Sequence, residues 1–157
     1  MNDVKVFPAP SAGDVVIFRW IKKDNAGVIS EKVRPAIILR VIEPDRWCEF
    51  IRVSIVYGTA KGGPLQATEF SIERSRHPAE FARAGLYRDG RFDMLNFVTC
   101  GWTDQTFAIP KDPRFGETPK IGSIHPRTTE RLKAAHLAAV DYGRLQNELL
   151  GRGVPRR

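Results

Sequence analysis

The sequence predicts an α+β protein that is mainly β: a small, mostly antiparallel barrel of five to six strands with a short helix and a long C-terminal helix. Two observations lead to this prediction. Short segments rich in β-branched and aromatic residues are separated by turn residues such as Gly, Pro, Asn and Asp. The segment 126–150 instead repeats its apolar residues at the spacing of a helix. A barrel is favoured because it closes strand edges that would otherwise aggregate.

The strands are expected in the first two thirds of the chain, and residues 111–125 hold only turns. Pro35 donates no ladder hydrogen bond, so it belongs at the start or edge of its strand. In the third strand, alternation places Tyr57 on one face and Ser54 on the other. In chain order, the expected strands are 15–21, 34–43, 47–57, 66–73, 94–102 and 105–110.

Two helices are expected. In the segment 77–86, Pro78 lies in the first turn, where proline is tolerated. The segment 126–150 begins at Pro126 and is ended by Gly151. The apolar stripe of this long helix consists of Leu132, Ala135, Ala139, Tyr142 and Leu149.

We expect one domain over residues 13–150, preceded by an extended N-terminal arm at 1–12 and followed by a basic tail at 151–157. A length of 157 residues favours a single domain with a sizeable core. No apolar run approaches the roughly 20 residues that cross a bilayer, and the N-terminus lacks the apolar core of a signal peptide. The sequence therefore predicts a cytoplasmic protein without a membrane partner.

The net charge of the chain is +7. Three arginines of the predicted tail supply part of this charge, which leaves about +4 on the rest of the chain. The charge alone therefore favours a nucleic-acid partner only slightly. A basic surface favours polyanions because each neutralised phosphate releases counterions. The two cysteines, Cys48 and Cys100, give neither a disulfide framework nor zinc-ligand spacing. We expect no metal and no cofactor.

The segment KVRPAIIL, 32–39, places a guanidinium and a proline at the mouth of an apolar strand. In one interpretation Arg34 is an ordinary strand-end residue paired with Glu31 or Glu43. In the other, Pro35 stiffens the backbone that aims Arg34 into a pocket. A guanidinium offers a fork of donors that matches two phosphate oxygens, which lysine does not.

Five segments, in order, resemble the MazF/PemK/Kid family of toxin endoribonucleases. GDVVIFRW, a polar loop and KVRPAIILRV match the N-terminal pattern of the family. RVSIVYGTAKGG lies at the position of its third strand, MLNFVTCGWTD at its late core strand, and KIGSIHPRTTERLKAAHLAAV at its closing segment. The resemblance spans about residues 13–145.

The resemblance implies an SH3-like barrel, usually a homodimer, with a cognate antitoxin protein as partner. It also implies metal-independent, sequence-specific cleavage of single-stranded RNA, in which a ribose 2′-OH attacks the adjacent phosphate. Such a reaction needs a base, an acid and a cation that stabilises the phosphorane.

Arg34 matches the catalytic arginine of the family. The family also has a Thr or Ser at the end of the third strand, and here Ser54, Tyr57 and Thr59 compete for that position. Thr59 is favoured, with Ser54 second, because Thr59 precedes a glycine-rich loop whose backbone N–H groups can approach a phosphate.

The late strand departs from the family. Some members carry an acidic residue with an arginine there, whereas the best-aligned positions here are Met94 and Asn96, with Arg91 and Asp93 just before them. These departures keep a second hypothesis open: a catalytically inactive barrel that binds nucleic acid or protein, with the long segment 73–92 as a partner surface. The expected RNA-binding residues are Lys22, Lys23, Lys32, Lys61, Arg76, His77 and Asn96. His77 is either an RNA-facing proton donor or part of a solvated loop at a helix start.

Overall fold

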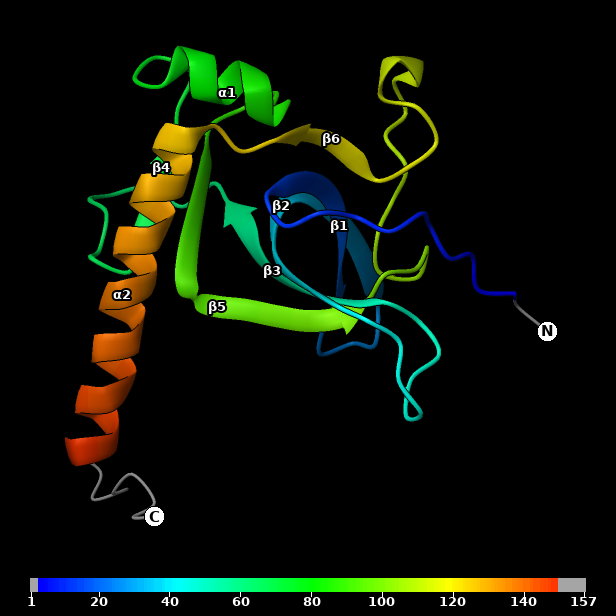
Figure 1. Cartoon of the computed structure of the whole chain (residues 1–157), viewed down its shortest axis with the longest axis horizontal. Coiled ribbons are helices and arrows are strands. Elements are labelled where there is room, and N and C mark those ends of the chain that lie inside the picture. The colour runs from blue at the N-terminus through cyan, green and yellow to red at the C-terminus, as the bar shows by residue number, and fades with distance from the viewer. Residues whose placement is uncertain (1–2, 150–157) are drawn as a thin grey trace.

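The structure is a computed structural model that describes residues 3–149, so the predicted tail at 151–157 lies outside the described residues. Its six strands form one antiparallel sheet in the order β4-β5-β3-β2-β1-β6, curled into a half-barrel (Figure 1). The predicted small antiparallel barrel with two helices is confirmed. The elements are β1 Asp14–Lys23, β2 Ile29–Ile42, β3 Arg52–Thr59, β4 Glu69–Ile72, α1 Pro78–Ala84, β5 Gly90–Gly101, β6 Lys120–Ser123 and α2 Pro126–Leu149.

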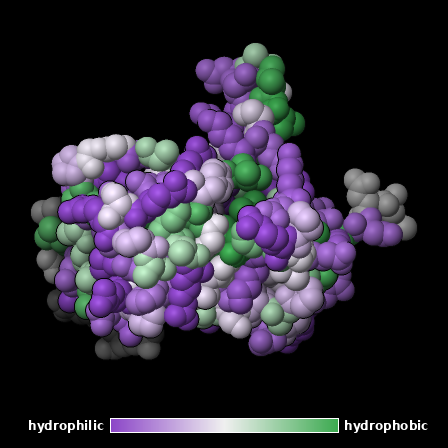
Figure 2. All heavy atoms as spheres, turned by 90° about the horizontal axis from the view of Figure 1, so that it is seen from above, coloured by the Kyte–Doolittle hydropathy of each residue, from purple (hydrophilic) through white to green (hydrophobic). Residues whose placement is uncertain are grey.

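β1 and β2 form a hairpin that is longer than the sequence predicted. β2 begins at Ile29 rather than at residue 34, and the loop shrinks to 24–28. The loop is tight because the Asp24 carboxylate accepts the backbone N–H groups of Ala26 and Val28. The hairpin points away from the viewer in Figure 1 and projects from the body in Figure 2, where it shows hydrophobic as well as hydrophilic surface.

The third strand was predicted at 47–57 but runs over Arg52–Thr59. Its start is delayed because the Asp45 carboxylate accepts the backbone N–H groups of Trp47 and Cys48, which closes a loop instead. Its end is extended because Thr59 still pairs with β5. Thr59 therefore belongs to the strand and not to the following loop.

The late strands also differ from the prediction. A single strand, β5, covers Gly90–Gly101 and turns a corner (Figure 1) where its pairing with β3 shifts register. The predicted strand at 105–110 is wrong, because Phe107 closes a turn onto the carbonyl of Thr103 and reaches β1 through a single bridge to Phe18. The sequence also missed β6, a four-residue strand that pairs with β1.

The core is divided between the two faces of the sheet. One cluster lies under the helices, takes side chains from all six strands and includes Ile37 and Val56. The other includes Ile38 and Ile55 and packs with Phe7, Trp102 and Phe107. Adjacent residues of one strand therefore fill both clusters, which explains why the alternation in the sequence is imperfect.

The helices cover one side of the sheet. α2 runs beside β4 and β5, and α1 lies across the end near β6 (Figure 1). They are joined by Glu80 of α1, a buried carboxylate that accepts hydrogen bonds from Thr128 and Arg131 of α2. Of the predicted stripe, Leu132, Ala135 and Ala139 pack on the core, Tyr142 is 46% exposed, and the side chain of Leu149 lies outside the described part. Within residues 3–149, no helix has the length and apolarity to span a bilayer.

Candidate functional site

An open cleft of about 750 Å³ lies where the first half of β2 and the end of β3 approach the turn before β5. It is lined by residues 32–35, 58–61 and 87–90. A second hollow of about 590 Å³ shares residues 59–61 and 88–90 with it and adds Arg76. The two hollows bring together residues from four separate parts of the sequence.

Arg34 lines the cleft with donor capacity to spare. Its Nη1 donates to the carbonyl of Gly58 at 3.4 Å, and its guanidinium lies 5.7 Å from the centre of the Trp20 ring. Its Nε is buried and has no hydrogen-bond partner among the described residues. Because Nε is sealed from solvent, a phosphate in the cleft would meet the outer nitrogens Nη1 and Nη2, and no hydrogen bond of Nη2 is found within residues 3–149.

The strand-end interpretation of Arg34 is not supported. Glu31 pairs instead with Arg19, at 3.0 Å, and no ion pair of Arg34 is found within residues 3–149. Pro35 has the predicted edge character, because at this point β2 pairs only with β1 and its pairing with β3 begins at Ala36.

The three residues that competed for the Thr/Ser position lie in different places. Thr59 lines both hollows, and its Oγ1 donates to the carbonyl of Arg91 at 3.5 Å. Ser54 lies toward the other end of β3, where its hydroxyl bonds that of Thr99 at 2.8 Å. Tyr57 packs its ring 4.9 Å from that of Trp20. Of the three, only Thr59 shares the cleft with Arg34.

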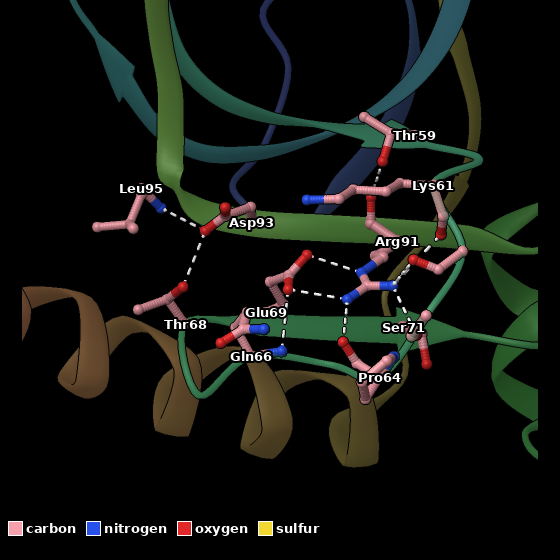
Figure 3. Close-up of polar contacts among 12 residues, drawn as sticks. Thr59, Lys61, Pro64, Gln66, Thr68, Glu69, Ser71, Arg91, Asp93 and Leu95 are labelled. Carbon is pink, nitrogen blue, oxygen red and sulfur yellow. Dashed lines mark hydrogen bonds and ion pairs between the residues drawn. The ribbon is translucent and has the colours of Figure 1, made fainter.

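Arg91 fixes the loop that follows Thr59 (Figure 3). Its Nε and Nη2 donate to the Glu69 carboxylate at 2.7 and 2.9 Å, and both side chains are buried. Its Nη1 also donates to the carbonyls of Gly62 and Gly63 at 3.0 and 2.8 Å, with further contacts to the carbonyls of residues 61 and 64. The hydrogen bond from Arg91 holds the pKa of Glu69 below its ordinary value, so the pair stays charged.

The same contacts orient the N–H groups of the loop. A trans peptide bond directs its N–H opposite to its C=O, and the described chain has no cis peptide bond. Since the carbonyls of residues 61 and 62 face Arg91, the N–H groups of Gly62 and Gly63 point away from it. A Cβ at either glycine would meet nothing within 4 Å, so other atoms do not crowd this part of the loop. This geometry suits an anion.

Arg91 and Asp93, the arginine and the acid just before the late-strand positions, both form hydrogen bonds within the protein. Arg91 holds the loop, and Asp93 accepts hydrogen bonds from the Thr68 hydroxyl and the Leu95 N–H, each at 3.0 Å. Met94 is buried in the core. These residues therefore serve the architecture around the cleft.

Sequence reasoning missed the third side of the cleft, formed by Tyr87, Arg88 and Asp89. Asp89 is the one acidic side chain among the described residues that line this cleft, and its Oδ1 accepts the Arg74 N–H at 2.8 Å. The signal was present as YRDG, in which an aromatic residue, a cation and an acid occupy a single turn.

The predicted RNA-binding residues divide into two groups. Lys32 and Lys61 line the cleft, and Arg76 lines the adjoining hollow. The others lie elsewhere: Lys22 and Lys23 at the exposed end of β1, Asn96 on exposed β5, and His77 at the start of α1, where its Nδ1 accepts the Glu73 N–H. Residues 3–149 hold no cluster of three or more His, Cys, Asp or Glu side chains arranged to bind a metal ion.

Comparison with known proteins gives a structural relationship. Neither a protein-family model nor a curated protein sequence matches the chain. Among solved structures, an endoribonuclease in complex with its cognate antitoxin, from mycobacterial species, matches with a TM-score of 0.50 and 18% identity over 85% of this chain and 96% of that chain. A second mycobacterial endoribonuclease has a TM-score of 0.47 and 17% identity over 85% and 93%. The chain shares its fold with the first of these enzymes.

Proposed function

We propose that this chain is the toxin of a toxin–antitoxin pair, related to the MazF/PemK/Kid family, and that it cleaves single-stranded RNA. The observation that carries the proposal is Arg34, whose guanidinium lines an open basic cleft and makes no ion pair within residues 3–149. Two further points support it: the fold is shared with an endoribonuclease, and the segment 32–39 resembles the corresponding segment of the family.

The reaction we propose needs no group from outside the chain other than RNA and water. A ribose 2′-OH gives its proton to the Asp89 carboxylate, and its oxygen bonds the adjacent phosphorus. Arg34 holds the phosphate and neutralises the charge that develops on it. The Thr59 hydroxyl turns its proton from the Arg91 carbonyl, 3.5 Å away, to donate a further hydrogen bond to the phosphate. The bond from phosphorus to the 5′-oxygen then breaks, and this oxygen takes a proton from water, which the open cleft admits. The hydroxide that remains takes the proton back from Asp89, which restores the carboxylate. The products carry a 2′,3′-cyclic phosphate and a 5′-hydroxyl.

The partners we propose come from the resemblance and from the matching complex. The neighbour was solved with its antitoxin, and we expect a cognate antitoxin and a homodimer here as well. An acidic or amphipathic antitoxin segment would lie across residues 22–32 and 58–63. The hairpin between β1 and β2 offers exposed apolar side chains to such a segment, namely Ile21, Val28, Ile29 and Val33. We expect the pair to act in the cytoplasm.

A second candidate function is a binding module without turnover. It is favoured by one observation: Arg91 and Asp93, which occupy the late strand where some relatives carry catalytic groups, are bound within the protein. In this case the basic cleft would hold RNA without cutting it.

Cleavage of a long single-stranded RNA by the purified protein in EDTA tests the proposal. We expect cuts at a few short sites, and a loss of roughly 10²- to 10³-fold in Arg34→Ala because a group that stabilises transition-state charge is removed. Arg40→Ala is the matched control, since Arg40 is an exposed arginine on the same strand that does not line the cleft. RNA binding without any cutting by the wild-type protein would favour the binding module.

A further inference from the structure

The segment 74–89 ends inside the candidate cleft. It leaves β4, forms α1 and returns toward β5 (Figure 1), so that its last residues line the same cleft as Arg34. Tyr87 lies on this return and also borders a further hollow of about 480 Å³ with Arg74 and Arg88. An aromatic side chain thus lines the same cleft as the guanidinium that we assign to the phosphate.

Tyr87 is not used to pack the core. Tyr87 is 56% exposed, whereas its neighbour Leu86 and the nearby Phe81 are 8% and 6% exposed. The guanidinium of Arg88 lies 5.2 Å from the centre of the Tyr87 ring. A largely exposed ring held next to a cation has the chemistry of a stacking platform for a nucleobase.

The backbone that carries Tyr87 is fixed on both sides. Arg74 Nη2 donates to the Tyr87 carbonyl at 3.3 Å, and the Arg74 N–H donates to Asp89 at 2.8 Å. The Arg74 guanidinium itself lies 4.9 Å from the centre of the Phe81 ring. Upstream, Gly85 ends α1 with a φ of 71° and packs against β6. A platform that is already ordered loses little entropy when a ligand binds.

We infer that Tyr87 stacks a base of single-stranded RNA adjacent to the phosphate held by Arg34. This inference rests on the proposed function. Because every base presents a π-face, such a platform sets affinity and the register of the strand more than the identity of the base. Arg88 contributes a charge to the same site, either over the ring or toward a neighbouring phosphate.

The test uses an RNA carrying 2′-O-methyl groups throughout, which lacks the attacking hydroxyl and is therefore not cut. Its affinity for the full chain is measured by fluorescence anisotropy. Loss of a stacked base weakens binding roughly 5- to 150-fold, so we expect a loss in that range for Tyr87→Ala and almost none for Tyr87→Phe. Tyr87→Leu, which keeps bulk but not the ring, should resemble Tyr87→Ala.

A second measurement identifies the contact with a base. In a series of these RNAs, each with one abasic position, one position should weaken binding by the wild-type protein and have no further effect on Tyr87→Ala. The salt dependence provides a control, because Arg88→Ala should reduce the slope of log affinity against log salt by about one whereas Tyr87→Ala should leave it unchanged.

The outcomes separate this inference from the proposed function. If the wild-type protein cuts RNA but Tyr87→Ala and Tyr87→Leu bind like wild type, the platform is refuted and the nuclease stands. The platform is also refuted if Tyr87→Ala loses the same factor at every abasic RNA, because no single base is then coupled to the ring. If the wild-type protein neither binds nor cuts RNA, both proposals fail.

Discussion

Gly85 is the residue at which a single methyl group should disturb both the stability and the cleft. Its φ of 71° lies in the left-handed region, which costs an alanine about 1–2 kcal/mol. A Cβ at this position would also overlap the carbonyl oxygen of Ile121 and lie 2.8 Å from its carbonyl carbon. Since both obstructing atoms belong to the backbone, β6 has to move, and overpacking of this kind costs about 1–3 kcal/mol.

The two contributions predict that Gly85→Ala lowers the free energy of unfolding by about 2–5 kcal/mol. For a domain of this size, each kcal/mol lowers the melting temperature by roughly 2–4 °C. Calorimetry or chemical denaturation measures the loss. Gly143→Ala is the matched control: Gly143 lies within α2 with nothing within 4 Å of an added Cβ, so alanine there should stabilise by roughly 0.5–1 kcal/mol.

The same variant tests the link between α1 and the cleft. Because Gly85 lies two residues before Tyr87, a displaced β6 contact should also move the wall of the cleft, and RNA affinity should fall in protein that is still folded. A Gly85→Ala protein whose stability equals that of wild type would refute the packing described between α1 and β6.

Three further predictions concern buried groups. Arg91→Lys removes the forked donors that hold the carbonyls of residues 61–64, so amide hydrogen exchange should accelerate in that loop while the core strands stay protected. The pKa of Glu69 is lowered in the folded state, so its pair with Arg91 stabilises the protein above the ordinary carboxyl pKa and loses this effect as the pH falls through the lowered value. The protection of the amides of residues 61–64 from hydrogen exchange should therefore be constant from pH 7 to about pH 5 and decline below it. Burial raises the pKa of the Cys100 thiol to about 12, so iodoacetamide at pH 8 should alkylate Cys48 first, and equal labelling of both would contradict the burial of Cys100.

Local sequence patterns were sufficient to predict the central strands and to single out Arg34. The first two strands are dense in β-branched residues because both faces of the sheet are covered, and the Arg-Pro pair marks where β2 extends past β3. The segment 105–110 has the same composition as a strand, but a turn at Thr103 leaves it with only an isolated bridge to β1, at Phe107. Composition does not distinguish a strand from an extended segment that buries one side chain.

The remaining part of the site depends on contacts between distant residues. The sequence of β6 contains Gly122 and therefore predicts a turn. Because Gly122 has no side chain, the backbone at the end of α1 can approach β6 closely. That approach directs the chain from Gly85 to Tyr87 and so completes the cleft. No local pattern encodes this juxtaposition, which explains why the basic loops were predicted and the wall that contains Tyr87 and Asp89 was not.

The chemistry of the ends left on cut RNA is the most direct test of the proposed reaction. A synthetic RNA containing a mapped site is incubated with the protein in EDTA, and the fragments are weighed by mass spectrometry. Attack by the 2′-OH with Arg34 stabilising the phosphorane predicts a 2′,3′-cyclic phosphate on one fragment and a 5′-hydroxyl on the other. Fragments with 3′-hydroxyl and 5′-phosphate ends, or cutting that requires a divalent metal, would contradict it.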